Sequence, residues 1–260
     1  VGWWKLEGNG TDSYDGLPAT VVGAIPTTDK FDRANSALYF DGINDSADIG
    51  ISTKLKIQKV TVCGWFKTSS NTAGWLFVKK ARSYGGWVGY GVNLGLYETG
   101  KVAVRIQQSS APSFIDKRIT KSFSDNKWHH VAFTYTGSTF RLYYDGVREP
   151  TMDGTGGGIY YGDVIYENYN ASIGAEITNS RWENFFVGSI ADVRVYNRAL
   201  SESEISVVYN RVLDATTTII VSDSIGSPPE YQQQKHQIKA TYEPTSQEPI
   251  VQEVITPIVE

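Results

Sequence analysis

The chain has 260 residues, which is enough for one large β domain or two smaller ones. Its net charge of -4 gives it none of the basic surface that nucleic acid or an anionic membrane attracts, and no apolar run approaches the roughly 18 residues of a membrane-spanning helix. Aromatic residues make up 13% of the sequence, and Gly, Thr, Val and Tyr are frequent, which favours an all-β protein.

Short runs of alternating apolar and polar residues follow one another along most of the chain, separated by turn-forming pairs such as Asp41-Gly42 and Asp145-Gly146. In chain order, the predicted strands lie at residues 3–6, 17–25, 37–40, 60–67, 75–79, 89–94, 101–107, 128–135, 139–144, 171–174 and 186–197. Many short strands joined by frequent turns are typical of a two-sheet antiparallel β-sandwich, or jelly roll. We therefore predict that fold for residues 1–212.

The stretch from 186 to 205 is the most informative part of the sequence. Its first half alternates like a half-buried strand but is irregular near Ala191-Asp192, where a carboxylate falls inside the strand. Its second half begins with Ser201, which Glu204 follows three residues later, and this spacing predicts a capping box that opens one short helix.

After residue 212 the composition changes, with prolines spaced among Ile and Val and few aromatic residues. We expect residues 213–260 to form an extended tail. Because two of its segments, 237–242 and 249–259, alternate like strands, we expect residues 215–260 to dock on another copy of the chain or on a larger scaffold by adding a strand to a sheet.

Few residues are suited to catalysis. His129 and His130 are adjacent on a predicted strand, so their side chains point to opposite faces, one inward and one outward, and cannot chelate a metal together. Cys63 is the only cysteine and lies in an apolar strand, where a thiol packs as a small hydrophobic group. The paired carboxylates of a glycosidase are not found on any predicted strand. We therefore predict a protein that is not an enzyme.

Three predicted loops are rich in aromatic residues, interleaved with Gly and Asn. The side chains that we expect to contact a ligand are Tyr84, Trp87, Tyr160, Tyr161, Arg181 and Trp182. Such loops suit a shallow sugar platform, a protein interface in which Tyr, Trp and Arg dominate binding, or simple packing at the edge of the sandwich. The sequence leaves these three alternatives open.

Six separate motifs along the chain indicate the same family of domains. They are Trp3 to Gly8 with Thr11 to Ser13, Ala37 to Asp45, Val60 to Lys67, Lys127 to Tyr135, Leu142 to Gly146 and Gly188 to Ile205. Together they resemble the laminin-G-like, concanavalin-A-like jelly-roll domains of surface proteins. The resemblance covers residues 1 to about 212 and implies a non-catalytic module, in a family whose fold says little about the ligand.

The resemblance also implies a structural calcium ion. In that case Asp12 and Asp192 would meet, and Asn9, Asp15 and loop carbonyls would complete a shell of oxygen ligands. The chain departs from the family at Val193, where the closing strand usually carries a second acid. The alternative is that Asp12 and Asp15 cap turns and that Asp192 pairs with an arginine.

These observations predict an adhesion or recognition module that is extracellular, on a cell surface or on a virion surface. It would bind a glycan or a surface protein through its aromatic loops, be stabilised by calcium and be anchored by its tail. The alternative is a purely structural subunit of a filament, surface layer or capsid exterior, assembled by strand addition from the tail.

Overall fold

In the computed structural model the chain divides into two units, Val1–Asn210 and Arg211–Glu260. The described residues are 1–83, 86–95, 99–107, 114–119, 121, 123–150, 169–178 and 181–211, without the side chains of 80–83, 86–88, 107, 114–117 and 178. The predicted tail therefore lies outside the described residues, and its docking stays a prediction.

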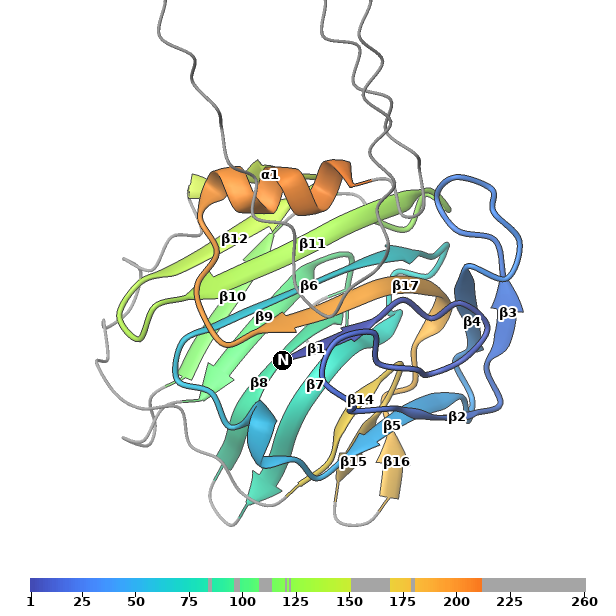
Figure 1. The fold of residues 1–260 in the computed structure, drawn as a ribbon, viewed down its shortest axis with the longest axis horizontal. Coiled ribbons are helices and arrows are strands. Elements are labelled where there is room, and N and C mark those ends of the chain that lie inside the picture. The colour runs from blue at the N-terminus through green and yellow to red at the C-terminus, as the bar shows by residue number, and fades with distance from the viewer. Residues whose placement is uncertain are drawn as a thin grey trace, which may run out of the picture. The chain divides into compact units, whose positions relative to one another are not determined.

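Eight strands within the described residues form the first antiparallel sheet. Its order is β13 (Val147–Arg148), β12 (Phe140–Tyr144), β11 (Trp128–Tyr135), β6 (Val60–Lys67), β17 (Val187–Tyr196), β4 (Ala37–Asp41) and β3 (Ile25–Thr27), while β1 (Gly2–Trp4) also pairs with β17 (Figure 1). The strands closest in sequence are not always neighbours in space, because β6 and β17 meet in the middle of the sheet.

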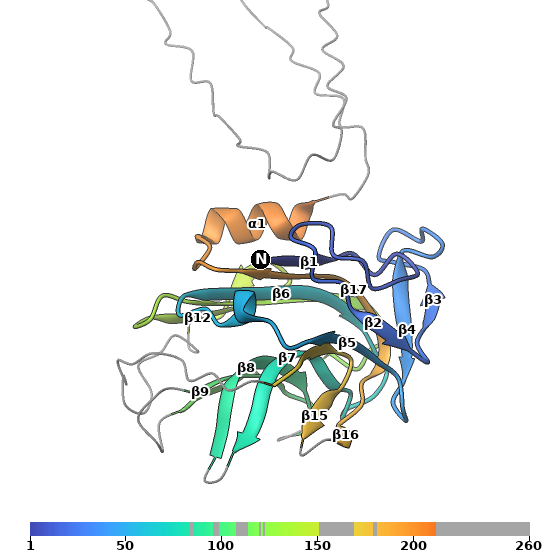
Figure 2. The same ribbon diagram turned by 60° about the horizontal axis from the view of Figure 1, so that its bottom comes forward.

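Seven described strands form the second antiparallel sheet, which lies as a separate layer beneath the first (Figure 2). Its order is β10 (Phe114–Ile119), β9 (Val102–Gln107), β8 (Gly86–Leu94), β7 (Gly74–Ser83), β14 (Ala171–Ile173), β5 (Ser46–Gly50) and β2 (Thr20–Val22). A separate hairpin consists of β15 (Glu176–Thr178) and β16 (Arg181–Glu183). The predicted two-sheet antiparallel sandwich is confirmed.

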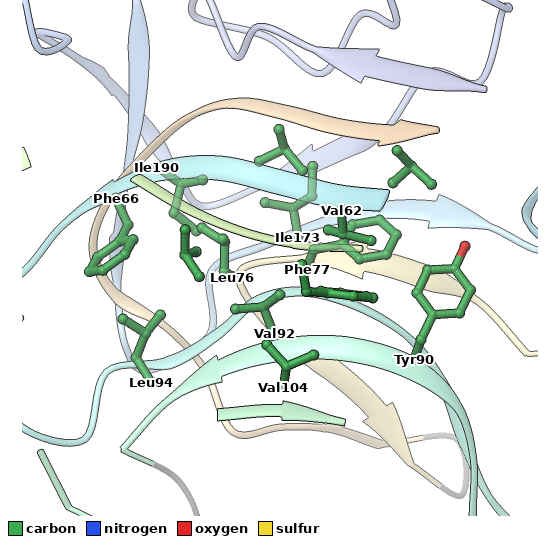
Figure 3. Close-up of a cluster of buried hydrophobic side chains, with 14 of the residues drawn as sticks. Val62, Phe66, Leu76, Phe77, Tyr90, Val92, Leu94, Val104, Ile173 and Ile190 are labelled. Carbon is green, nitrogen blue, oxygen red and sulfur yellow. The ribbon is translucent and has the colours of Figure 1, made fainter. Parts of the chain in front are cut away.

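Alternation decides which side chains enter the core, because successive residues of a strand point to opposite faces. Apolar side chains from the facing sides of both sheets interdigitate to form one buried cluster (Figure 3). The labelled members are Val62, Phe66, Leu76, Phe77, Tyr90, Val92, Leu94, Val104, Ile173 and Ile190. Removing each such side chain from water contributes about 1.5–3 kcal/mol, so this layer is the main source of stability.

One predicted strand is wrong in its extent. Residues 17–25 do not form a single strand, because β2 ends at Val22 in one sheet and β3 begins at Ile25 in the other. Gly23 lies between them with φ +77°, a conformation that glycine adopts without a steric cost. This turn is where the chain crosses from one layer to the other.

The helix α1 (Glu202–Asn210) covers the outer face of the first sheet and begins with the predicted capping box. The Glu204 main-chain N–H donates to Ser201 Oγ at 3.2 Å, and the Ser201 N–H donates to Glu204 Oε2 at 2.8 Å. Its buried side chains form a cluster with the sheet: Cys63, Ala132, Tyr143, Leu200, Ile205 and Val208. Among the described residues there is no helix with both the length and the apolar character needed to cross a membrane.

The irregularity predicted near Ala191-Asp192 is a β-bulge. Before it, residues 187–190 of β17 pair with β4; after it, residues 193–195 pair with β1. Asp192 lies at the bulge with φ 52°, and its N–H donates to the Lys5 carbonyl at 3.1 Å. The bulge therefore allows one strand to hold two different partners along the same edge.

Candidate functional site

The loop that follows β1 is organised by the carboxylate of Asp12. This carboxylate accepts hydrogen bonds from the main-chain N–H groups of Trp3 at 2.8 Å, Tyr14 at 2.9 Å, Asp15 at 3.1 Å and Leu17 at 2.9 Å. Hydrogen bonds from N–H donors to a charged oxygen are among the stronger ones in proteins. Asp12 thus closes the loop and ties it to β1.

The other two loop residues predicted as metal ligands are also engaged. The Asn9 side-chain oxygen accepts a hydrogen bond from the Thr11 N–H at 2.9 Å. Asp15 forms an ion pair with Lys54, with 3.0 Å between Oδ1 and Nζ. Both contacts are partly open to solvent, and each uses an oxygen that a metal ion would need.

Asp192 is 4% exposed and is paired within its own strand. Its two oxygens accept hydrogen bonds from Arg194, from Nε at 2.8 Å and from Nη2 at 2.9 Å, and Oδ1 also accepts one from the Trp3 indole at 2.5 Å. The Arg194 guanidinium lies over the Trp3 ring, 4.5 Å from its centroid. Burial lowers the pKa of Arg194, but Asp192, together with Tyr196 and Cys63, outweighs burial and raises that pKa.

These contacts occupy the oxygens of Asp12 and Asp192, the two acids expected to share a calcium ion. Trp3 connects the two acids, since its main-chain N–H donates to Asp12 and its indole donates to Asp192. Calcium requires six to eight oxygen ligands, whereas the oxygens of both acids already face N–H donors. In the part of the chain that the structure describes, no three His, Cys, Asp or Glu residues gather as a metal-binding group. As arranged, the residues do not fit a shared calcium ion, so the calcium that the resemblance implies would require these side chains to rearrange.

Among the residues predicted to bind a ligand, the structure places Arg181 and Trp182 together on β16. Arg181 is exposed, and Trp182 is partly exposed opposite Ile177 of β15. The side-chain amide of Asn184 donates to the buried carboxylate of Glu176, which fixes the base of this hairpin. The hairpin therefore presents an indole on one face and a cation on the other, because successive residues of a strand point to opposite faces.

The remaining predicted ligand residues cannot be placed. Tyr84, Tyr160 and Tyr161 lie outside the described residues, and so does the side chain of Trp87. Their contribution to a binding surface stays a prediction.

The two histidines point to opposite faces of β11, as predicted, but neither faces open solvent. His129 lies beside Phe66 at the end of the core, with its side chain 12% exposed. His130 is 1% exposed because the outer face here is covered, and its ring packs against Trp65 and Tyr209. Burial lowers the pKa of His130 to about 3, so this ring stays neutral.

His129 is held between two carboxylates that the sequence did not indicate. Its Nδ1 lies 2.9 Å from Asp145 Oδ2, and its Nε2 lies 3.0 Å from Asp125 Oδ1. Asp145 also accepts the His130 main-chain N–H at 2.8 Å. The hydrogen bond to Asp145 raises the pKa of His129 above its usual 6.5, burial opposes this, and Asp125 raises the pKa further.

The two carboxylates beside His129 should make the free energy of unfolding depend on pH. Because the folded pKa of His129 is raised, the stabilisation is fully present below about pH 6.5 and is lost as the pH rises through the folded value. The thermal midpoint of the wild type should therefore fall more between pH 6 and pH 9 than that of His129→Gln. Thermal unfolding followed by circular dichroism across this range measures it, and parallel curves for the two proteins would contradict the prediction.

Comparison with known proteins agrees with this architecture. Residues 35–206 match the sequence model described as the concanavalin A-like lectin/glucanases superfamily. The adhesion G-protein coupled receptor V1 of Danio rerio is 25% identical over 203 residues, which span 74% of this chain and 3% of the receptor. This chain therefore corresponds to a small part of that relative.

Two solved structures illustrate the shared fold. Domain 4 of AbnA, a GH43 extracellular arabinanase from Geobacillus stearothermophilus in complex with arabinotriose, aligns with a TM-score of 0.60 and 19% identity, covering 80% of this chain and 97% of that one. A Trypanosoma rangeli sialidase mutant with trans-sialidase activity aligns with a TM-score of 0.54 and 18% identity, covering 80% of this chain and 32% of that one. At this identity the likeness shows the fold alone.

Proposed function

This chain belongs to the concanavalin A-like lectin/glucanases superfamily, and from that membership we propose that it is a non-catalytic, extracellular module that binds a glycan or a surface protein. Two relatives support a recognition role, namely an adhesion receptor and a domain of an extracellular arabinanase whose structure contains arabinotriose. The description of the superfamily names both lectins and glucanases, so the fold does not decide between binding and catalysis.

The observation that carries the proposal is the β15–β16 hairpin. It forms a two-stranded sheet apart from both layers of the sandwich, and it presents the partly exposed Trp182 on one face and the exposed Arg181 on the other. An indole ring stacks on the flat C–H face of a sugar or fills a pocket on a protein partner. Trp and Arg are also the residues most often found at binding hot spots.

Replacing Trp182 tests this proposal. Trp182→Ala should weaken binding at least about tenfold, because truncating a binding hot spot costs about 2 kcal/mol or more, whereas Trp182→Phe should retain part of the affinity. The measurement is a glycan array followed by titration calorimetry on the strongest ligand. Ile51→Ala, which removes a side chain that is 59% exposed, provides the matched control. Equal binding by all variants would show that the hairpin is not the site.

The calcium ion can be tested independently. A ligand that binds only the folded state raises the unfolding temperature. Because the oxygens of Asp12 and Asp192 already accept hydrogen bonds from N–H donors, we expect less than about 1 °C between midpoints measured with calcium chloride and with a chelator. A rise of several degrees that Asp12→Asn abolishes would instead establish calcium at this loop.

A further inference from the structure

Four strands of the first sheet bring four distant side chains into one line, which we call the cross-strand row. Tyr39 of β4 faces Ser189 of β17, Ser189 faces Lys67 of β6, and Lys67 faces Trp128 of β11. Residues directly opposite each other in antiparallel strands project on the same side of a sheet. Their neighbours Leu38, Ile190 and Phe66 enter the core, so the row lies on the outer face.

Three side chains of the row are available to a ligand, whereas Ser189 is buried between them at 8% exposed. Tyr39 is 39% exposed, and Lys67 and Trp128 are partly exposed. Within the described residues, no hydrogen bond or ion pair engages the Tyr39 hydroxyl, the Ser189 hydroxyl, the Lys67 ammonium or the Trp128 indole N–H.

Two threonines near the ends of β6 differ from the row, because their hydroxyls form hydrogen bonds within the fold. Thr61 Oγ1 donates to the Arg198 carbonyl at 2.8 Å, and Thr68 Oγ1 donates to the Val187 carbonyl at 2.7 Å. These two hydroxyls are thus satisfied within the fold, whereas the Tyr39, Lys67 and Trp128 groups face solvent, where a ligand can replace water.

The dimensions of the row suit an extended ligand. Adjacent strands lie about 4.8 Å apart, so the three steps from β4 to β11 place the Tyr39 and Trp128 positions about 14 Å apart. Two rings at this separation, with the Lys67 ammonium between them, match an oligosaccharide better than a single sugar. Each ring offers a face for C–H stacking, and the ammonium between them offers hydrogen bonds.

The positive charge of Lys67 favours a ligand that carries acidic groups. Lys67 provides a cation without an acidic partner among the described residues. Asp41 lies two residues beyond Tyr39 on the same face, but its Oδ1 already accepts the N–H groups of Ile43 at 2.8 Å and Asn44 at 3.3 Å. A hydrogen bond between an ammonium and a carboxylate or sulfate is about twice as strong as a neutral one. We propose that the cross-strand row binds an acidic oligosaccharide.

This inference extends the proposed binding function to a second surface, because the row lies on the eight-stranded sheet and the Arg181–Trp182 hairpin does not. The test titrates the full chain with three acidic probes, namely hexagalacturonate, a hyaluronan hexasaccharide and a heparin-derived hexasaccharide, and with neutral maltohexaose. At least one acidic probe should bind more tightly than maltohexaose, and its affinity should fall as salt is added.

Variants locate the site. Lys67→Gln and Tyr39→Ala should each weaken binding of that acidic probe at least about tenfold, since a hydrogen bond to a charged group contributes about 1.5–3 kcal/mol. Tyr39 is exposed, so its replacement should leave the circular dichroism spectrum unchanged. Lys54→Gln, which removes a different exposed lysine, should bind like the wild type.

Two results would overturn the proposal. One is that no acidic probe binds more tightly than maltohexaose. The other is an affinity that Lys67→Gln and Tyr39→Ala leave unchanged while Trp182→Ala abolishes it; this result would place the ligand at the hairpin, supporting the proposed function and removing the row as a site.

Discussion

Replacing Arg194 with leucine should lower the free energy of unfolding by about 3–5 kcal/mol, because it leaves a buried carboxylate without its partner. Asp192 is 4% exposed and Arg194 is 3% exposed, and their two hydrogen bonds are 2.8 and 2.9 Å long. Removing both charges together should cost much less, since a buried ion pair contributes little relative to neutral groups of similar shape. The double variant Asp192→Asn/Arg194→Leu should therefore recover most of the loss.

Asparagine is a suitable replacement at position 192 for two reasons. It tolerates the positive φ of 52°, and its side-chain oxygen can still accept the Trp3 indole N–H. Denaturant unfolding of the wild type, both single variants and the double variant completes a thermodynamic cycle. If the double variant is as unstable as Arg194→Leu alone, the loss comes from packing and not from the unpaired carboxylate.

The strands that the sequence predicted best are those with a clean local pattern. Residues 60–67 and 128–135 alternate between a core side and an outer side, and β6 and β11 have those same limits. Alternation is a property of neighbouring residues, so it can be recognised without knowing the fold. The short strands β15 and β16 carry too little pattern to be recognised and were not predicted.

The candidate sites depend on contacts that no local pattern contains. The sequence pattern marks the acid inside β17 as unusual. Its position where β17 changes partner becomes visible only when β1 and β4 are placed along the same edge of that strand. Asp12 was expected to bind a metal or cap a turn, and only the folded loop shows its four N–H donors. The cross-strand row likewise arises from pairing registers between residues far apart in the sequence.

The N-terminal strand β1 should also contribute strongly to the free energy of unfolding. It lies before residue 35, where the superfamily match begins. Trp4 is fully buried, its ring stacks on Phe77 with centroids 6.1 Å apart, and its indole N–H donates to the Leu17 carbonyl at 2.7 Å. β1 is thus part of the sandwich and not an appendage.

Trp4→Ala should therefore lower the free energy of unfolding by about 3–5 kcal/mol, the usual cost of removing a buried aromatic side chain and leaving a cavity. Trp4→Phe keeps a ring in the core but loses the hydrogen bond to Leu17, so it should cost less. Chemical denaturation of both variants measures the difference, and Tyr14→Ala controls for an aromatic residue of the same segment that is 47% exposed. A cost for Trp4→Ala no larger than that of the control would mean that the domain is complete without β1, and that the pairing of β1 beyond the bulge at Asp192 adds little to its stability.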